Sequence, residues 1–305
     1  MISVIIPAYN EETNIMILTK KVIEQLEICR DDYEIIFIDD GSSDGTASKI
    51  KELHEQNPCI KLVSLSRNFG HQKALKAGID HSSGDCVICM DADMQHPPEL
   101  IPQLLEKWRQ GYDVVYTIRK ETKDASIFKI TTSKIFYWLI NKLTEVDIKE
   151  GAADFRLMDK KVVDELKRLN ETFLFIRGLV SWVGFKQVGI NYAASSRYSG
   201  VSKYSVRKMM KFAWDGITSF SIAPLRLAIS IGTIISLLSF LYGIYVLAIV
   251  LFTDKAVPGW ASILISILFI GGIQLLCIGI LGEYLGKMFI EAKRRPIYIV
   301  KDKLL

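Results

Sequence analysis

The chain has 305 residues, of which 50% are hydrophobic and 24% charged, and its mean hydropathy is +0.22. This composition excludes intrinsic disorder, which needs low hydrophobicity and high net charge, and the length suits about two domains. The net charge of +4 is mild. Proteins that bind nucleic acids usually carry a larger and more clustered basic excess, so we expect no nucleic-acid partner.

The first part of the chain alternates short hydrophobic runs with segments of helical periodicity. The runs expected to be strands are 3–7, 34–38, 60–65, 86–90 and 113–118, and the segments expected to be helices are 14–28, 46–56, 71–81 and 98–110. This alternation predicts an α/β, Rossmann-like domain with a mostly parallel sheet and helices on both faces. In such open sheets, ligands bind beyond the carboxyl ends of the strands.

Acidic clusters follow three of these strands. They are residues 8–12, 39–45 and 91–93. Asp91 and Asp93 leave a buried strand as alternate residues, so their carboxylates can converge on one Mg²⁺ or Mn²⁺ ion, with substrate phosphates as further ligands. We therefore expect a divalent cation and a diphosphate ligand at this end of the sheet.

The other two clusters allow more than one interpretation. Asp39 and Asp40 are placed to accept hydrogen bonds from a base or a ribose. Asp44 and Glu12 are explained equally well by the capping of helices and the closing of turns. The sequence contains neither GxxxxGK[ST] nor GxGxxG, so neither standard phosphate-binding loop is expected.

The five cysteines are scattered along the chain, and an odd number argues against a disulfide framework. Cys86 and Cys89 form a CxxC pair, but residues three apart in a strand point to opposite faces, so we interpret both as core residues. The N-terminus has no basic segment and meets Pro7 early. It predicts no signal peptide and a chain that begins in the cytoplasm.

Two long uncharged stretches, 227–253 and 256–282, follow Arg226. Each exceeds the roughly 20 residues that cross a bilayer, so we predict two transmembrane helices at about 227–253 and 257–282; the alternative is two buried helices of a soluble domain. Basic residues flank the pair on its outer sides: Lys203, Arg207, Lys208, Lys211, Arg226, Lys287, Lys293, Arg294, Arg295, Lys301 and Lys303. The connecting loop has only Lys255. The positive-inside rule then places both termini and the N-terminal domain in the cytoplasm of a multi-pass cell-membrane protein.

Two further segments, 127–143 and 201–220, mix lysine and arginine with large hydrophobic residues. This pattern predicts helices at an anionic membrane surface, although an ordinary packing helix has the same pattern. The predicted organisation is a cytoplasmic domain 1–200, an interfacial helix 201–225, a transmembrane hairpin 226–286 and a cytoplasmic basic tail 287–305. Glycines in the second hydrophobic stretch favour close helix packing, including between copies of a homo-oligomer: Gly271, Gly272, Gly279, Gly282 and Gly286.

Three motifs together resemble those of the inverting glycosyltransferase family 2, which has the GT-A fold. They are PAYNEE at 7–12, DDGSSDGT at 39–46 and MDADMQHPPE at 90–99. More narrowly, the chain is similar to the polyprenyl-phosphate glycosyltransferases, which include dolichyl-phosphate mannose synthase and bactoprenol glucosyltransferases. The similarity covers nearly the whole chain, including residues 151–158, 197–203, the two hydrophobic stretches and 295–298.

The resemblance implies a role for each matching residue. Those expected to bind the nucleotide sugar are Pro7, Tyr9, Glu11, Ile38, Asp40, Asp91, Ala92 and Asp93, and those expected to hold the metal are Asp93, Gln95 and Asp91. Phosphate or acceptor binding falls to Arg119, Arg197 and Lys203, residue types that commonly bind phosphate. The catalytic residues implied are Asp154, Asp91 and Asp93.

Asp154 matches the position usually assigned to a catalytic base. A lipid phosphate is already largely ionised at pH 7, because the second phosphate pKa is about 6, so an orienting role for Asp154 is the alternative. The implied hexosyltransferase reaction moves one hexose, with inversion, from UDP-glucose or UDP-GlcNAc to undecaprenyl or another polyprenyl phosphate on the cytoplasmic leaflet, for cell-envelope glycan modification. A processive polysaccharide synthase is one alternative, although such enzymes usually carry a QxxRW motif that is missing here. A non-catalytic scaffold or flippase subunit is the other.

Overall fold

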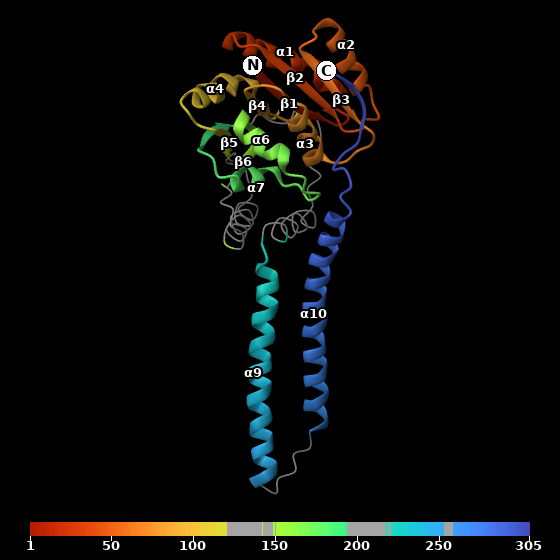
Figure 1. The fold of residues 1–305 in the computed structure, drawn as a ribbon, viewed down its shortest axis with the longest axis vertical. Helices are drawn as coiled ribbons and strands as arrows, with labels where there is room; N and C mark the ends of the chain where they lie inside the picture. Colours follow the sequence, from red (N-terminus) through yellow and green to blue (C-terminus); the bar gives the residue numbers. More distant parts are fainter. Residues whose placement is uncertain (121–141, 143–148, 150, 194–217, 219–220, 253–258) are drawn as a thin grey trace. The chain divides into compact units, whose positions relative to one another are not determined.

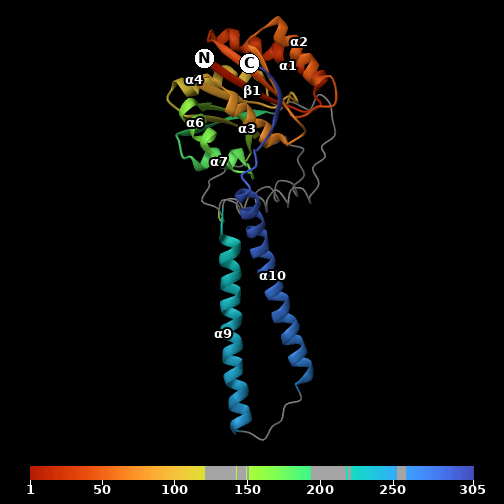
Figure 2. The same ribbon diagram turned by 45° about the vertical axis from the view of Figure 1, so that its right-hand side comes forward.

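The computed structural model describes residues 1–120, 142, 149, 151–193, 218, 221–252 and 259–305. The chain divides into two compact units (Figures 1 and 2). The first unit consists of Met1–Ala213 together with Arg295–Leu305, and the second is Trp214–Arg294. The second unit is therefore an insertion, because the chain leaves the first unit and returns to it.

An eight-stranded sheet forms the centre of the first unit, in the order β7-β5-β6-β4-β1-β2-β3-β8. Its strands are β1 (Ile2–Ala8), β2 (Tyr33–Asp39), β3 (Ile60–Leu65), β4 (Cys86–Cys89), β5 (Val114–Lys120), β6 (Ala152–Asp159), β7 (Gln187–Ala193) and β8 (Val300–Leu304). β1 is parallel to β2 and β4, β2 to β3, and β5 to β7. β6 is antiparallel to β4 and β5, and β8 to β3. The predicted α/β class is confirmed, with antiparallel neighbours added to the parallel strands.

Helices cover both faces of this sheet. They are α1 (Glu12–Cys29), α2 (Thr46–Gln56), α3 (His71–His81), α4 (Ile101–Arg109), α6 (Lys160–Arg168) and α7 (Ile176–Trp182), with a short 3₁₀ helix, η1 (Pro98–Leu100), before α4. The predicted elements up to residue 118 are all present, with ends that differ by a few residues. The main difference is that the predicted helix 98–110 starts as η1.

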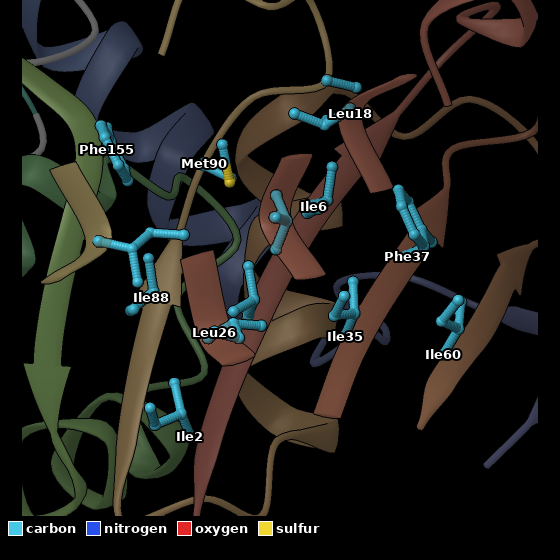
Figure 3. Packing of buried hydrophobic residues seen from close by; sticks show 14 of the residues in the cluster. Ile2, Ile6, Leu18, Leu26, Ile35, Phe37, Ile60, Ile88, Met90 and Phe155 are labelled. Carbon is cyan, nitrogen blue, oxygen red and sulfur yellow. The ribbon is translucent and has the colours of Figure 1, made fainter. Parts of the chain in front are cut away.

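The core beneath α1, α2 and α4 follows the periodicities of the sequence. α1 buries side chains at helical spacing, Ile15, Leu18, Val22 and Leu26, against alternate residues of the central strands (Figure 3). On the opposite face α3 packs closely on β1 and β2. A Cβ atom at Gly78 would lie only 2.1 Å from Cγ2 of Ile5, so α3 needs glycine at this contact.

The end of the chain, predicted only as a basic tail, adds a strand to the sheet. β8 pairs with β3, and the N–H of Ser66 donates to the carbonyl of Ile299 at 2.9 Å. Lys51 and Asp302 form an exposed ion pair of 2.9 Å beside it. The C-terminal residues are thus part of the first unit.

The second unit contains α9 (Ala223–Phe252) and α10 (Trp260–Ala292), which run alongside each other. Segments Ala223–Val246 and Ile265–Ala292 are long and hydrophobic enough to cross a membrane, with hydropathies of 2.1 and 2.3. α10 extends ten residues beyond the predicted end at 282. The N-terminal side of α9 is joined to α10 by the hydroxyl of Tyr284, which donates to the carbonyl of Ser221 at 2.6 Å. The predicted interfacial helices fall almost entirely outside the described residues.

Candidate active site

The loops after β1 and β2 are joined to each other at the carboxyl edge of the sheet. The N–H of Asn10 donates to Oγ of Ser42 at 3.0 Å, and the N–H of Ser43 returns a hydrogen bond of 2.9 Å to Oδ1 of Asn10. Oε2 of Glu12 accepts from the N–H of Gly45 at 3.1 Å. Glu12 therefore closes a loop, which is one of the two roles that the sequence allowed for this residue. Oδ1 of Asp44 likewise accepts from the N–H of Thr46 at 3.0 Å.

Asp40 anchors the start of α3. Its carboxylate accepts hydrogen bonds from the N–H groups of Phe69, at 2.7 Å, and Gly70, at 2.9 Å. Burial raises the pKa of Asp40 above its ordinary value, because the opposing effect of these two hydrogen bonds is smaller. Oδ1 of the neighbouring Asp39 accepts from the N–H of Ser42 at 3.0 Å. Both aspartates predicted to read a base or ribose thus hold the loops of this edge in place.

The other residues expected to bind the nucleotide lie on β1, β2 and the loop between β1 and α1. Pro7 and Ile38 are buried neighbours in register on adjacent strands. Tyr9 is 48% exposed at the edge of the sheet. Oε2 of Glu11 accepts from Nδ2 of Asn14 at 2.6 Å, within the first turn of α1. The structure thus places these four residues at one end of the sheet.

Asp91 follows β4 and is supported by two histidines. Its N–H donates to Nδ1 of His96 at 3.0 Å, so the proton of a neutral His96 ring is on Nε2, which lies 3.7 Å from Oδ2 of Asp91. Nε2 of His71, the first residue of α3, lies 3.4 Å from Oδ1. His96 is buried and stacks on Phe155 with ring centroids 5.3 Å apart. Each oxygen of the Asp91 carboxylate therefore has a histidine nitrogen within 3.7 Å.

Asp93, Gln95 and Arg119 lie together beside Asp91 in the sequence-predicted metal and phosphate site. Oδ1 of Asp93 accepts from the N–H of Gln95 at 3.1 Å, and Oε1 of Gln95 accepts from Nη1 of Arg119 at 3.3 Å. Ala92 is buried between the two aspartates. Arg119 comes from β5, so the sheet order brings a distant cation to the loop after β4.

Asp154, on β6, is buried among cations. Nε of Arg177 donates to Oδ1 at 2.7 Å and Nη2 donates to Oδ2 at 2.8 Å, which makes a two-point contact. Nη2 of Arg156 lies 3.7 Å from Oδ1, and Nε2 of His71 lies 3.6 Å from Oδ2. Burial alone would raise the pKa of Asp154, but Arg177, followed by His71 and Arg156, holds it well below the usual range. Asp154 is therefore ionised and is a weak proton acceptor.

His71 is the residue that connects these two carboxylates. Its side chain is 42% exposed. Burial lowers the pKa of His71, but contact with Asp154 and the charge of Asp91 outweigh burial and raise it above the ordinary value. His71, Arg177, Arg156 and His96 were not among the predicted site residues. His96 and Arg156 lie within segments that carry the resemblance, at 90–99 and 151–158, and His71 starts the predicted helix after the third strand, at the same edge as Asp91.

The donor atoms at this edge suit a hard divalent cation. Asp91, Asp93 and Gln95 present oxygen atoms, which Mg²⁺ and Mn²⁺ prefer. Among the residues that the structure describes, no group of three or more His, Cys, Asp or Glu side chains is arranged to hold a metal by itself. A cation here would depend on oxygens of the substrate to complete its coordination, as the spacing of the two aspartates predicted. Arg197 and Lys203 lie outside the described residues.

The fold and the acidic edge of the sheet define an α/β enzyme of the GT-A class, a glycosyltransferase. Residues 3–167 match the model of the family described as Glycosyl transferase family 2, and the chain belongs to that family. This confirms the resemblance seen in the sequence motifs.

Several proteins are similar over nearly their full length. "Uncharacterized glycosyltransferase YkcC" of Bacillus subtilis is 45% identical over 98% of this chain and 93% of its own. "Bactoprenol glucosyl transferase" of Shigella phage SfV is 44% identical over 99% of this chain and 98% of its own. Among solved structures, mannosyl-3-phosphoglycerate synthase from Rubrobacter xylanophilus has a TM-score of 0.48 at 16% identity, covering 70% of this chain and 71% of that one.

Proposed function

We propose that the protein transfers a single hexose from a nucleotide sugar, UDP-glucose or UDP-GlcNAc, to a polyprenyl phosphate such as undecaprenyl phosphate. The observation that carries this proposal is the two-point contact of the buried Asp154 carboxylate with Arg177. A residue held ionised by the two-point contact with Arg177 is poorly suited to deprotonate a hydroxyl acceptor. A phosphate acceptor needs no such base, because it is already largely ionised at pH 7. The printed names of the bactoprenol glucosyl transferases, relatives over nearly the full length, support the same acceptor.

The reaction is a single in-line displacement. An oxygen of the acceptor phosphate attacks the anomeric carbon, the bond from that carbon to the diphosphate breaks, and the nucleoside diphosphate leaves with the electron pair. Mg²⁺ or Mn²⁺, when bound, neutralises charge on the departing diphosphate. Asp91, Asp93 and Gln95 are the residues that would hold it. Arg119, hydrogen-bonded to Gln95, is placed to orient a phosphate at the same edge.

Both hydrophobic helices cross the cell membrane in this proposal, with the catalytic unit and both termini in the cytoplasm. This orientation is supported by the distribution of basic residues. They lie on the outer sides of the helix pair, such as Arg226 and Lys293, whereas the connecting loop has only Lys255. The lengths and hydropathies of α9 and α10 support the crossing itself. A transferase anchored in this way meets its lipid acceptor in the same membrane.

The proposal is tested with purified protein, radiolabelled UDP-glucose or UDP-GlcNAc, Mn²⁺ or Mg²⁺, and undecaprenyl phosphate. We expect one labelled lipid that carries a single sugar. If neither donor labels the lipid, a wider set of nucleotide sugars is tried. Failure of all of them to label the lipid overturns the proposal. A long polymer as product would point instead to a processive synthase.

A pair of variants tests the acidic edge within the same assay. Asp93→Ala should abolish turnover while the protein stays folded and membrane-bound. Glu99→Gln removes an exposed acid a few residues away and should leave turnover unchanged. Retained activity in Asp93→Ala would remove Asp93 from the proposed site.

A further inference from the structure

We propose that His71 is a positioning residue that fixes the carboxylates of Asp91 and Asp154 relative to each other; this proposal rests on the proposed function. Nε2 of His71 lies 3.4 Å from Oδ1 of Asp91 and 3.6 Å from Oδ2 of Asp154. The two aspartates come from different strands, β4 and β6, and His71 comes from α3. One imidazole therefore connects the metal-binding edge with the buried cluster around Asp154.

The backbone on the N-terminal side of His71 is held firmly. Asp40 accepts hydrogen bonds from Phe69 and Gly70, the two residues before His71. Gly70 has a φ of +98°, a conformation that residues with a side chain rarely adopt. The backbone that leads into His71 is thus fixed by a buried aspartate and by a turn that favours glycine.

The next residue, Gln72, ties the same turn of α3 to α7. Its Oε1 accepts from the N–H of Ile176 at 2.9 Å, and Ile176 directly precedes Arg177. His71 therefore approaches Oδ2 of Asp154 directly, while Gln72 holds the backbone next to Arg177, which contacts both oxygens of Asp154. The first turn of α3 thus contacts Asp154 through His71 and, through Gln72, contacts the residue before Arg177.

The electrostatic arrangement explains why a residue is needed between the two carboxylates. Two negative groups that face one site repel each other, and each is stabilised by a positive or hydrogen-bonding group placed between them. Besides His71, Asp154 contacts Arg177 and Arg156. Within the part of the chain that the structure describes, Oδ1 of Asp91 contacts His71. Loss of His71 should therefore affect the position of the Asp91 carboxylate more than the contact between Asp154 and Arg177. Groups that orient ligating carboxylates typically contribute 10–100-fold to metal affinity or activity.

Three substitutions separate positioning from simple packing. In His71→Gln the side-chain amide nitrogen can reach the position of Nε2. In His71→Asn the amide nitrogen reaches only the position of Nδ1, and His71→Ala removes the hydrogen-bonding group altogether. Lys73→Gln, in the same turn of α3, is the control. For each variant, kcat and the donor KM are measured in the lipid assay. Mn²⁺ binding is measured separately, by electron paramagnetic resonance of the free ion, once in the presence of UDP and once in its absence.

We expect His71→Ala to lower kcat by roughly 10–100-fold and to weaken Mn²⁺ binding at least several-fold, with a smaller change in the donor KM. His71→Gln should recover most of both losses, His71→Asn should not, and Lys73→Gln should match the wild type. Equal losses in the Gln and Asn variants, values for His71→Ala within twofold of the wild type, or no Mn²⁺ binding by the wild type would overturn the proposal. Mn²⁺ binding needs no turnover, so it tests His71 even where the lipid assay rejects the proposed function.

Discussion

The hydroxyl of Tyr298 donates a hydrogen bond of 3.0 Å to Oδ2 of Asp80, 218 positions earlier in the chain. Asp80 lies near the end of α3, where its other oxygen accepts from Nζ of Lys76, a lysine that is almost completely buried. Burial, followed by the charge of Asp80, raises the pKa of Tyr298 above its ordinary value, so the hydroxyl remains a donor. The segment after α10 is therefore attached to α3 as well as to β3.

Tyr298→Phe should lower the stability of the catalytic unit by about 1 kcal/mol, because Asp80 loses a hydrogen-bond donor. This corresponds to a fall of roughly 2–4 °C in the midpoint of thermal unfolding, measured in detergent. Lys51→Met breaks the exposed ion pair with Asp302 on the same segment and should cost less, typically under about 1 kcal/mol. A larger loss in Lys51→Met than in Tyr298→Phe would contradict this ranking of the two contacts.

The buried Glu34 predicts a dependence of stability on pH. Burial by itself would raise the pKa of Glu34, but hydrogen bonds from Lys61, Ser3 and Ser83 outweigh it and lower the pKa. A carboxylate with a lowered pKa in the folded state stabilises the protein above its unfolded pKa, about 4.3, and this contribution is lost as the pH falls through the folded value. Glu34→Gln should therefore cost on the order of 2 kcal/mol at pH 7, the size of hydrogen bonds to a charged group, and less in acid.

The measurement for Glu34 is the midpoint of urea unfolding between pH 7 and about pH 3.5, followed for wild type and variant. The difference between the two should shrink as the pH falls through the carboxylate range. Glu55→Gln, at an exposed position of α2, makes the same change of charge and serves as the control. A difference that stays constant with pH would mean that Glu34 contributes through its shape alone.

Arg177 should be necessary for both stability and turnover. Arg177→Met leaves the buried Asp154 without its two-point contact, which should cost about 2 kcal/mol and lower kcat by roughly 10–100-fold. Arg177→Lys keeps the charge without the planar fork and should fall between Arg177→Met and the wild type. Urea unfolding and the lipid assay measure the two effects.

The matched control for Arg177 is Arg168→Met. Arg168 is 74% exposed and pairs with Glu165 at 2.7 Å on the surface of α6, so its loss should change stability by less than about 0.5 kcal/mol. Similar effects of the two methionine variants would show that the contact with Asp154 has no special importance.

The reactivity of the cysteines follows from their burial. Burial raises the pKa of both Cys86 and Cys89 to about 12, and the thiolate is the form that reacts. Cys59 is exposed. A water-soluble maleimide at pH 7 should therefore modify Cys59 first, and Cys86 and Cys89 only after denaturation, as followed by intact mass. Rapid modification of Cys86 or Cys89 in the folded protein would be inconsistent with their place in β4.

Local patterns in the sequence predicted the first unit well up to residue 118. Hydrophobic periodicity is a local property, so the strands and helices from β1 to β5 could be found without knowledge of their neighbours. The position of Asp91 and Asp93 followed from a rule of topology, because the carboxyl ends of parallel strands share one edge. The predicted roles of Tyr9, Arg119 and the other matching residues remain predictions that rest on the resemblance.

The elements that the sequence did not predict depend on long-range pairing. β8 contains two lysines and an aspartate in five residues, a composition typical of an exposed edge strand and of a solvated tail alike. Only the pairing of these residues with β3 in the folded chain distinguishes an edge strand from a solvated tail. The same holds for β6, which lies antiparallel between β4 and β5 and so carries Asp154 to the acidic edge.

The sequence by itself determined the class of fold, the two hydrophobic helices and the acidic edge of the sheet, because each depends on spacing within a short stretch of chain. Only the tertiary structure decided that Asp154 meets Arg177 and that His71 lies between Asp154 and Asp91. These side chains come from β4, β6, α3 and α7, and no local pattern specifies which distant charge neutralises a buried carboxylate. That choice is made by the packing of the whole unit, which excludes water from Asp154 and so requires partners for its charge.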